Sequence, residues 1–239
     1  MVLKKILQLK KKGNCTVKDI ISLDATTTLL PTPLTSFSRY PRSSLVLSDM
    51  KILLEGKWLN DNIINEGQRL IKQEYPHVEG FQDVALAHTM GFSVEPGEFV
   101  QLLYAVGHWV TISTIGCDPA EVDVFDSGGR VLNNKLRQQI AALLCTSYDV
   151  ITVKCFNQRP LVYHNVVNAL PQCQPQVGGN DCGIFALAFA FVLAQCGHPS
   201  AYDFDQKNML GARKHSIRQG TFDSPFPYQA KSGIWLASV

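Results

Sequence analysis

The sequence lacks several features that would assign it to a specialised class of protein. None of its seven cysteines forms a CxxC pair, so the zinc-ribbon and thioredoxin-like patterns are both missing. No apolar segment behind the N-terminal Met has the character of a secretory signal, and no internal repeat is visible. Free thiols without an export signal predict an intracellular protein, in the nucleus or the cytoplasm.

The chain also lacks a strong net charge. A formal charge of +2 over 239 residues gives no field that would attract nucleic acid or a membrane surface, so we expect neither as a partner. With 46% hydrophobic and 18% charged residues, the chain has enough apolar side chains for one sizeable domain with a full core, or for two small ones.

The first 44 residues carry the weakest structural signal. Residues 1–12 mix five lysines with Leu and Ile, which allows a short basic amphipathic helix, a targeting patch or a solvated terminus. Residues 25–44 are rich in Thr, Pro and Ser, as linkers are. We expect a flexible extension over 1–44 and one folded domain over 45–239, with its core over about 45–227.

Hydrophobic periodicity predicts both helices and strands in the folded part. Ser48 and either Asn60 or Asp61 are the expected helix caps. The patterns favour helices over 48–56, 61–74, 133–145 and 203–219, and strands over 99–106, 149–156 and 161–167. Because helices stand beside an antiparallel hairpin rather than alternate strictly with strands, the expected fold class is α+β.

The most informative stretch contains Cys182. The following segment, Ile184–Ala194, is apolar on every face, which predicts a helix buried at the centre of the domain and too short to span a bilayer. Asp181 is the expected N-cap and Gly197 the expected stop. Cys182 would lie in the first turn, where unpaired N–H groups and the helix dipole favour a thiolate. A small, inert buried thiol is the alternative that this stretch alone leaves open.

A second stretch, Gly107–Gly129, predicts an antiparallel hairpin. Apolar and polar residues alternate on both sides of a turn at Gly116–Pro119. Folding the chain back near residue 117 pairs positions whose numbers sum to about 234, which sets His108 beside Asp126. An imidazole next to a carboxylate is the arrangement of a general base and its orienting group.

These two stretches supply complementary chemical groups. Cys182 would be the nucleophile, His108 the base and Asp126 the orienting residue. Gln176 could turn its amide back toward the Cys182 N–H and become a second hydrogen-bond donor for an oxyanion. Together these groups predict a thiol hydrolase.

The motifs as a set resemble the ubiquitin-like-protein-specific cysteine proteases, which deconjugate SUMO and related modifiers and include the adenovirus protease. The order His, Asp, Gln, Cys is the family's order, and the match runs from about Leu45 to Pro227. The resemblance rests on Trp58-Leu-Asn-Asp61, Gly107-His108-Trp109, Val124-Phe-Asp126-Ser127 and Gln176-x₅-Cys182-Gly183, with Asp181 before the Cys.

The resemblance implies a variant of the papain-like cysteine protease fold, with a mixed sheet and a buried central helix that carries the nucleophile. It implies a catalytic triad of Cys182, His108 and Asp126, and an oxyanion hole formed by Gln176 and the Cys182 N–H. The implied activity is hydrolysis after the C-terminal Gly-Gly of a SUMO-type modifier, without a cofactor or metal.

The resemblance also implies how a substrate binds. Trp58 and Trp109 would wall a narrow tunnel that admits only residues without a Cβ, and Asp61 would contact the modifier. The implied partners are a ubiquitin-like modifier and its lysine-linked conjugates, bound by a monomer. Taken alone, Trp58 indicates only a side chain that packs down on the helix after it.

Two features depart from the family pattern, and several alternatives stay open. Met209 and Arg213 are separated where the family usually has Met next to Arg, and the connection Asn157–Cys173 is longer than expected. The same fold could be an inactive modifier-binding module, or an acyl transferase or deconjugase for another ubiquitin-like modifier. A phosphate loop at Val177–Gly179 is disfavoured because no Lys-Ser/Thr follows. A metal site is disfavoured because its candidate ligands lack the usual spacing: His164, Cys173 and His198.

Overall fold

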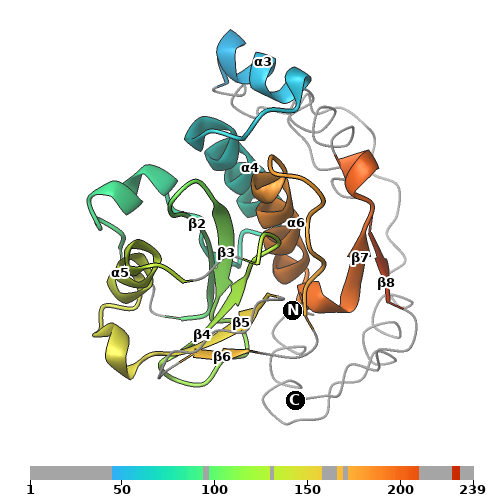
Figure 1. The fold of residues 1–239 in the computed structure, drawn as a ribbon. Helices are drawn as coiled ribbons and strands as arrows, with labels where there is room; N and C mark the ends of the chain where they lie inside the picture. Colours follow the sequence, from blue (N-terminus) through green and yellow to red (C-terminus); the bar gives the residue numbers. More distant parts are fainter. Residues whose placement is uncertain are drawn as a thin grey trace, which may run out of the picture. The chain divides into compact units, whose positions relative to one another are not determined.

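The computed structural model describes residues 45–93, 97–129, 132–157, 166–168, 172–209 and 228–231. All of them belong to one compact unit, Arg42–Ser232. Within this unit a mixed sheet carries helices on both faces, which confirms the α+β prediction (Figure 1). The extension expected over 1–44 lies outside the described residues, so its character stays a prediction.

The central sheet has six strands in the order β1-β2-β3-β4-β5-β6. These strands are β1 (Glu79–Gly80), β2 (Phe99–Tyr104), β3 (Trp109–Ser113), β4 (Glu121–Phe125), β5 (Thr152–Phe156) and β6 (Val166–Asn168). β2, β3 and β4 pair antiparallel, whereas β1 pairs with β2, β4 with β5 and β5 with β6 in parallel. A separate small sheet pairs β7 (Tyr202–Phe204) with β8 (Tyr228–Ala230).

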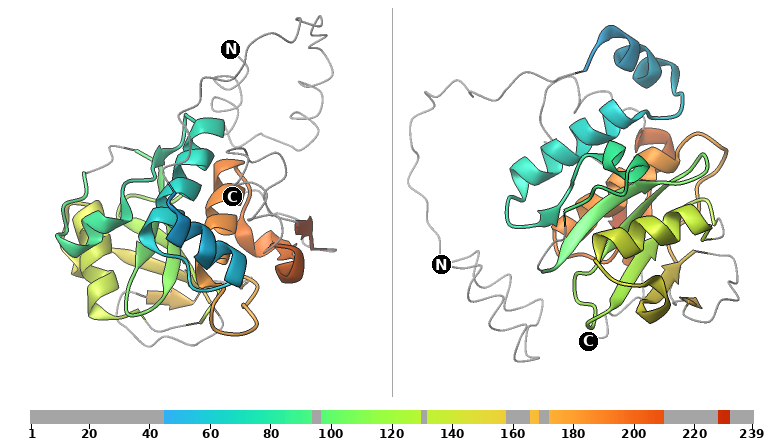
Figure 2. Two further views of the ribbon diagram at one scale, coloured as in Figure 1. Left: turned by 90° about the horizontal axis from the view of Figure 1, so that it is seen from above. Right: turned by 90° about the vertical axis from the view of Figure 1, so that its left-hand side faces the viewer.

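Helices cover both faces of the central sheet. The α-helices with defined ends are α3 (Leu47–Glu55), α4 (Asp61–Glu74), α5 (Asn134–Leu143) and α6 (Cys182–Ala194), and the 3₁₀ turns are η1 (Val84–His88), η2 (Tyr148–Val150) and η3 (Pro199–Ala201). α6 and α4 lie on one face and α5 on the other (Figures 1 and 2). Every helix in the described part of the chain is too short or too polar to cross a bilayer.

Capping explains where α3 and α4 start. The Asn60 side chain accepts a hydrogen bond from the backbone at the start of α4, as expected. The prediction for α3 is wrong by two residues, because Val46 precedes the helix and the Asp49 carboxylate, rather than Ser48, accepts the Val46 N–H. Gly56 ends α3 with a φ of 66°, which a residue without a Cβ adopts at little cost.

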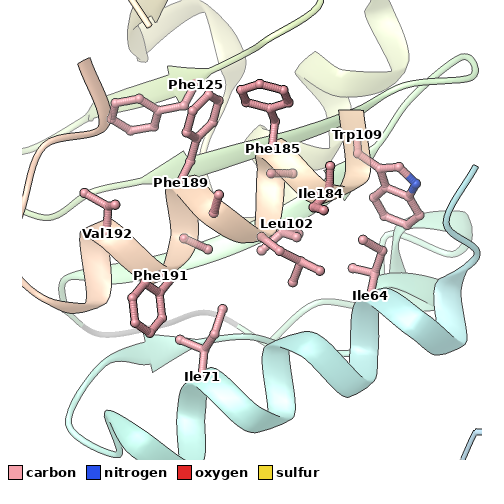
Figure 3. Packing of buried hydrophobic residues seen from close by; sticks show 14 of the residues in the cluster. Ile64, Ile71, Leu102, Trp109, Phe125, Ile184, Phe185, Phe189, Phe191 and Val192 are labelled. Carbon is pink, nitrogen blue, oxygen red and sulfur yellow. The ribbon is translucent and has the colours of Figure 1, made fainter. Parts of the chain in front are cut away.

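Helix α6 is the centre of the larger hydrophobic layer. All of its residues are buried, as its apolar pattern predicted. Figure 3 shows the helix between the sheet and α4, with Phe191 facing Ile71 of α4. On the sheet side, the Phe189 ring lies 6.4 Å from the Phe125 ring of β4. Burial on all sides fixes the helix, and with it the side chain at its first position.

Alternation along β3 separates the two layers. Trp109 packs in the α6 layer, and the Thr111 hydroxyl donates a 2.7 Å hydrogen bond to the Ala186 carbonyl of α6. Val110 faces the other way and packs with Ile140 of α5. The strand that follows His108 is therefore tied into both hydrophobic layers at once.

The hairpin of β3 and β4 exists, but its predicted register is wrong. Thr111 pairs with Phe125, so partner numbers sum to 236 rather than 234. The reason is the loop: Ser113 pairs with Asp123, so residues 114–122 lie outside the β3–β4 ladder and the connection is centred on residue 118 rather than on residue 117. Continued to the open end, this register sets His108 diagonal to Asp126 on one face, rather than directly opposite.

Two expectations at the ends of α6 are corrected. Asp181 is the N-cap by position, but its side chain makes no capping bond and instead accepts a hydrogen bond from Gln206 Nε2 at 2.5 Å. At the other end Cys196, rather than Gly197, takes the left-handed conformation with a φ of 61°. The Gly197 N–H then bonds back to the last turn of the helix.

Other predicted elements are present with different bounds. The strand expected over 149–156 is confirmed from Thr152, after the 3₁₀ turn η2. The helix expected over 203–219 is wrong at its start, because Asp203 lies in β7; a helical turn covers 206–209 and the rest lies outside the described residues. Of the possible strand over 161–167, only its last two residues are described, and they open β6.

Candidate active site

Cys182 is the first residue of α6, and its thiol is 2% exposed. Burial alone raises the pKa of this thiol. Hydrogen bonds from the His108 side chain and from the backbone N–H groups of Trp109 and Gly183 act in the opposite direction and prevail, so the pKa lies below its ordinary value. The start of α6 therefore stabilises a thiolate, as the sequence predicted.

His108 lies directly before β3 and is held by Asp126. Its Nε2 is 2.5 Å from Asp126 Oδ1, and both side chains are buried. Burial lowers the pKa of the imidazole, but the hydrogen bonds to Asp126 and to Cys182 outweigh it and raise the pKa to about 9. The predicted contact between His108 and Asp126 is therefore present, despite the different register.

The three side chains form a continuous hydrogen-bonded line. Asp126 contacts one ring nitrogen of His108, and the ring also hydrogen-bonds Cys182. The thiol pKa falls while the imidazole pKa rises, so both shifts favour a thiolate beside an imidazolium. That state combines a ready nucleophile with a proton donor for a leaving group.

Gly128 completes the support of the imidazole. Its N–H donates a 2.7 Å hydrogen bond to Asp126 Oδ1, the same oxygen that His108 contacts. A Cβ on Gly128 would lie 2.4 Å from Cε1 of the His108 ring, closer than real Cβ atoms approach. The absence of a side chain at this position leaves the space that the ring fills.

Gln176 lies in the loop before α6 and is bound to the residue after Asp126. Its N–H donates to the Ser127 carbonyl at 2.9 Å, and its Oε1 accepts from the Ser127 hydroxyl at 2.9 Å. Its Nε2 donates to the Gly178 carbonyl at 3.0 Å. The amide that the sequence assigned to an oxyanion hole is thus held at both ends.

Two glutamines fix the same loop to the segment around β7. Gln206 accepts from the Val177 N–H and donates to the Val177 carbonyl, both at 2.8 Å. Gln174 forms the equivalent pair with the Phe204 backbone. Two pairs of side-chain to backbone hydrogen bonds, one pair from each glutamine, therefore hold the loop that carries Gln176.

The predicted substrate-binding residues differ in accessibility. Trp58 is 44% exposed, and Asp61 is partly exposed with His88 Nε2 4.0 Å from its carboxylate. Trp109 is only 2% exposed, and its indole N–H donates to the Leu59 carbonyl at 3.0 Å. Trp109 therefore anchors the segment next to Trp58. Because the Trp109 ring is buried and the Trp58 ring is exposed, a wall of the predicted tunnel would come mainly from Trp58.

Two of the three candidate metal ligands, Cys173 and His198, lie in the described part of the chain. No group of three or more potential ligands occurs among the described residues. His198 packs edge-on against Phe125 and Phe156 and bonds Ser200. His164 lies outside the described residues.

Sequence reasoning gave no role to Ser127, Gly128 or Gln206. The two glycines that follow Asp126-Ser127 were a local signal that another group lies too close to the backbone there for a side chain to fit. The contacts of Ser127 and Gln206 bridge 49 and 29 residues, so no local pattern pointed to them.

No protein-family model matches the chain, and no curated protein sequence matches it. Solved structures do match. The C-terminal Ulp1 protease domain in complex with Smt3, the yeast orthologue of SUMO, is 17% identical, with 86% of this chain and 96% of that chain covered and a TM-score of 0.48. The catalytic domain of the Ulp1-like SUMO protease of Chaetomium thermophilum is 16% identical, with 71% and 75% covered and a TM-score of 0.41. Likeness at this level assigns no activity to this chain.

Proposed function

We propose that the protein is a thiol hydrolase in which Cys182 is the nucleophile, His108 the acid and base, and Asp126 the residue that orients His108. The observation that carries the proposal is the buried hydrogen-bonded line of these three side chains at the start of α6. A structural cysteine needs neither the imidazole nor the carboxylate behind it.

The proposed reaction uses the electron pair of the Cys182 thiolate and the proton of the His108 imidazolium. The Cys182 thiolate attacks the scissile carbonyl carbon, and the oxyanion meets the Cys182 N–H and one N–H of Gln176. The His108 imidazolium gives its proton to the leaving amine, the C–N bond breaks and a thioester remains. His108 then takes a proton from water, the hydroxide attacks the thioester, and the Cys182 thiolate leaves.

The proposed substrate is a SUMO-type modifier, cleaved after its C-terminal Gly-Gly from a lysine amine or a precursor tail. The motifs around Trp58 and Asp61 support this choice through their resemblance to the modifier-specific proteases, and Trp58 has the exposure that a substrate contact needs. An inactive binding module remains the alternative, and so does a deconjugase for another ubiquitin-like modifier.

An electrophilic probe tests the activity directly. A panel of ubiquitin-like modifiers, each ending in Gly-Gly and a thiol-reactive group, would be incubated with the full chain and followed by mass spectrometry. We expect the SUMO-type probe to add to Cys182, and Cys182→Ala to stay unlabelled. Binding of the probe without any adduct would identify a binding module, and labelling by a different modifier would redirect the substrate assignment.

The tail preference tests the contribution of Trp58. A Cβ on the substrate tail, placed in a slot beside the Trp58 indole, should cost about 1–3 kcal/mol, as overpacking does in a tight core. That free energy corresponds to a roughly 5- to 150-fold slower reaction. A Gly-Ala tail should therefore be cleaved more slowly than Gly-Gly, and Trp58→Ala should shrink that ratio while lowering overall efficiency. Leu54→Ala removes a similarly exposed apolar side chain from α3 and is the matched control. A ratio unaltered by Trp58→Ala would exclude the steric gate at this position.

A further inference from the structure

The segment Asp126-Ser127-Gly128 touches both halves of the proposed machinery. Asp126 holds His108, and Gly128 lies against the ring of the same histidine. Ser127, between them, is 3% exposed and bonds Gln176 through both its carbonyl and its hydroxyl. We propose that Ser127 is a positioning residue that holds the Gln176 amide in the orientation whose nitrogen faces the oxyanion; this inference rests on the proposed function.

The orientation of this amide has chemical consequences. An amide has a donor end and an acceptor end of nearly the same shape. If Nε2 faces the developing oxyanion it stabilises the charge, whereas Oε1 in the same place would repel it. A residue that only filled space around Gln176 would not separate the two orientations.

The Gly178 carbonyl selects the productive orientation, and the Ser127 hydroxyl secures it. The Gly178 carbonyl can only accept, so the amide end beside it has to be the nitrogen. Ser127 then meets the oxygen and donates its hydroxyl hydrogen to it. One hydrogen of Nε2 is used on Gly178, and the second is the one that the mechanism assigns to the oxyanion.

Removing the hydroxyl should loosen the amide without touching the nucleophile. In Ser127→Ala, Oε1 loses its donor, so the amide can turn toward solvent or reverse. Since the oxyanion exists only in the transition state, kcat should fall and KM should change little. We expect a fall of about tenfold, smaller than the roughly 10²- to 10³-fold loss when an oxyanion donor is removed altogether.

A double-variant cycle separates positioning from general damage. If Ser127 acts through Gln176, the pair Ser127→Ala with Gln176→Ala should be no slower than Gln176→Ala alone. The matched control is Ser113→Ala, which removes another fully buried hydroxyl from the far end of the same hairpin. It should lower thermal stability and leave kcat unchanged. Additive losses in the cycle, or equal kcat losses in the two serine variants, would overturn the inference.

A second measurement works without turnover. The two side-chain amide hydrogens of Gln176, assigned by their loss in Gln176→Ala, should give distinct nuclear magnetic resonance signals in the wild type. Ser127→Ala should shift or broaden them, and Ser113→Ala should not. A wild type that hydrolyses no modifier would refute the proposed function, and these resonances would still decide the role of Ser127. Signals unaffected by Ser127→Ala overturn it.

Discussion

Three cysteines are buried to nearly the same degree in this protein, yet their thiols have opposite chemistry. Cys155 on β5 is 0% exposed, and Cys173 is as buried as Cys182. Burial raises the pKa of Cys155 to about 12 and also raises that of Cys173. Only Cys182, of these three, has an imidazole and two backbone N–H groups as partners, and its pKa is lowered. Burial by itself therefore raises the pKa of a thiol. The pKa falls only where an imidazole and backbone N–H groups take the place of water as hydrogen-bond partners.

The largest test of this contrast replaces the nucleophile. Cys182→Ser should lower turnover of a modifier conjugate by about 10⁶-fold, as loss of a catalytic nucleophile does elsewhere, while the fold remains. Cys155→Ala is the matched control, because it removes an equally buried thiol whose pKa no imidazole lowers. Turnover per folded molecule should persist in the control. A Cys182→Ser enzyme with near wild-type turnover would remove this residue from the mechanism.

The next test removes the charge behind the imidazole. Asp126→Asn should lower kcat by about 10⁴-fold, because the imidazolium loses the carboxylate that stabilises and orients it. The pKa of His108 should fall, and alkylation of Cys182 at neutral pH should slow with it. Circular dichroism would check that the fold is retained. Unchanged alkylation would mean that Asp126 does not support the thiolate.

A third test displaces the ring and keeps every polar group. Gly128→Ala adds a Cβ 2.4 Å from His108 Cε1, so the imidazole has to move. A displacement near 1 Å can cost about 10²-fold in rate, and we expect a loss of that size. Gly179→Ala is the control, because it adds a methyl group in the loop before α6 with nothing within 4 Å. Equal activity of the two variants would show that the ring is not confined by Gly128.

The smallest expected effect is the pH dependence, which separates Cys182 from Cys155 without any substitution. The raised pKa of His108 keeps the imidazolium until pH passes about 9, and the lowered pKa of Cys182 keeps the thiolate as pH falls below the ordinary thiol value. kcat/KM should therefore be bell-shaped, falling about fivefold between pH 9 and 10 as the imidazolium is lost. Alkylation of Cys155 should stay slow across this range. An alkaline limit near pH 7 would contradict the assigned ion pair.

Local patterns were sufficient for much of the fold. The Asn60 cap predicted α4, and the apolar run after Cys182 predicted α6. Both could be recognised because a cap and a fully buried helix each require particular residue types at particular positions. The register of β3 and β4 was missed because it depends on where the loop is centred, and Gly116–Pro119 marked only part of that loop. The contact between His108 and Asp126 was still predicted, since a shift of two residues keeps both on the same face.

The candidate site was predictable only where each residue lay on a regular element. Cys182 begins a helix and His108 directly precedes a strand, so their neighbours in space could be inferred from the pattern. Ser127 and Gln206 act through contacts between distant segments, which sequence spacing does not encode. Trp109 was expected to face a substrate, but alternation along β3 turns its ring into the α6 layer, where it is buried.

The uniformly apolar surface of α6 also bears on how the protein is made. On its own, this helix would expose hydrophobic side chains on every side and would tend to aggregate. The segments that form α4, β2 and β3, against which it packs, all leave the ribosome before it does. His108, Asp126 and Gln176 also precede Cys182, so a nascent chain has the proposed base and the proposed oxyanion donor before the proposed nucleophile. Chains halted before α6 is complete should carry a Cys182 thiol with an ordinary pKa, and a lowered pKa would report that α6 has packed against the sheet.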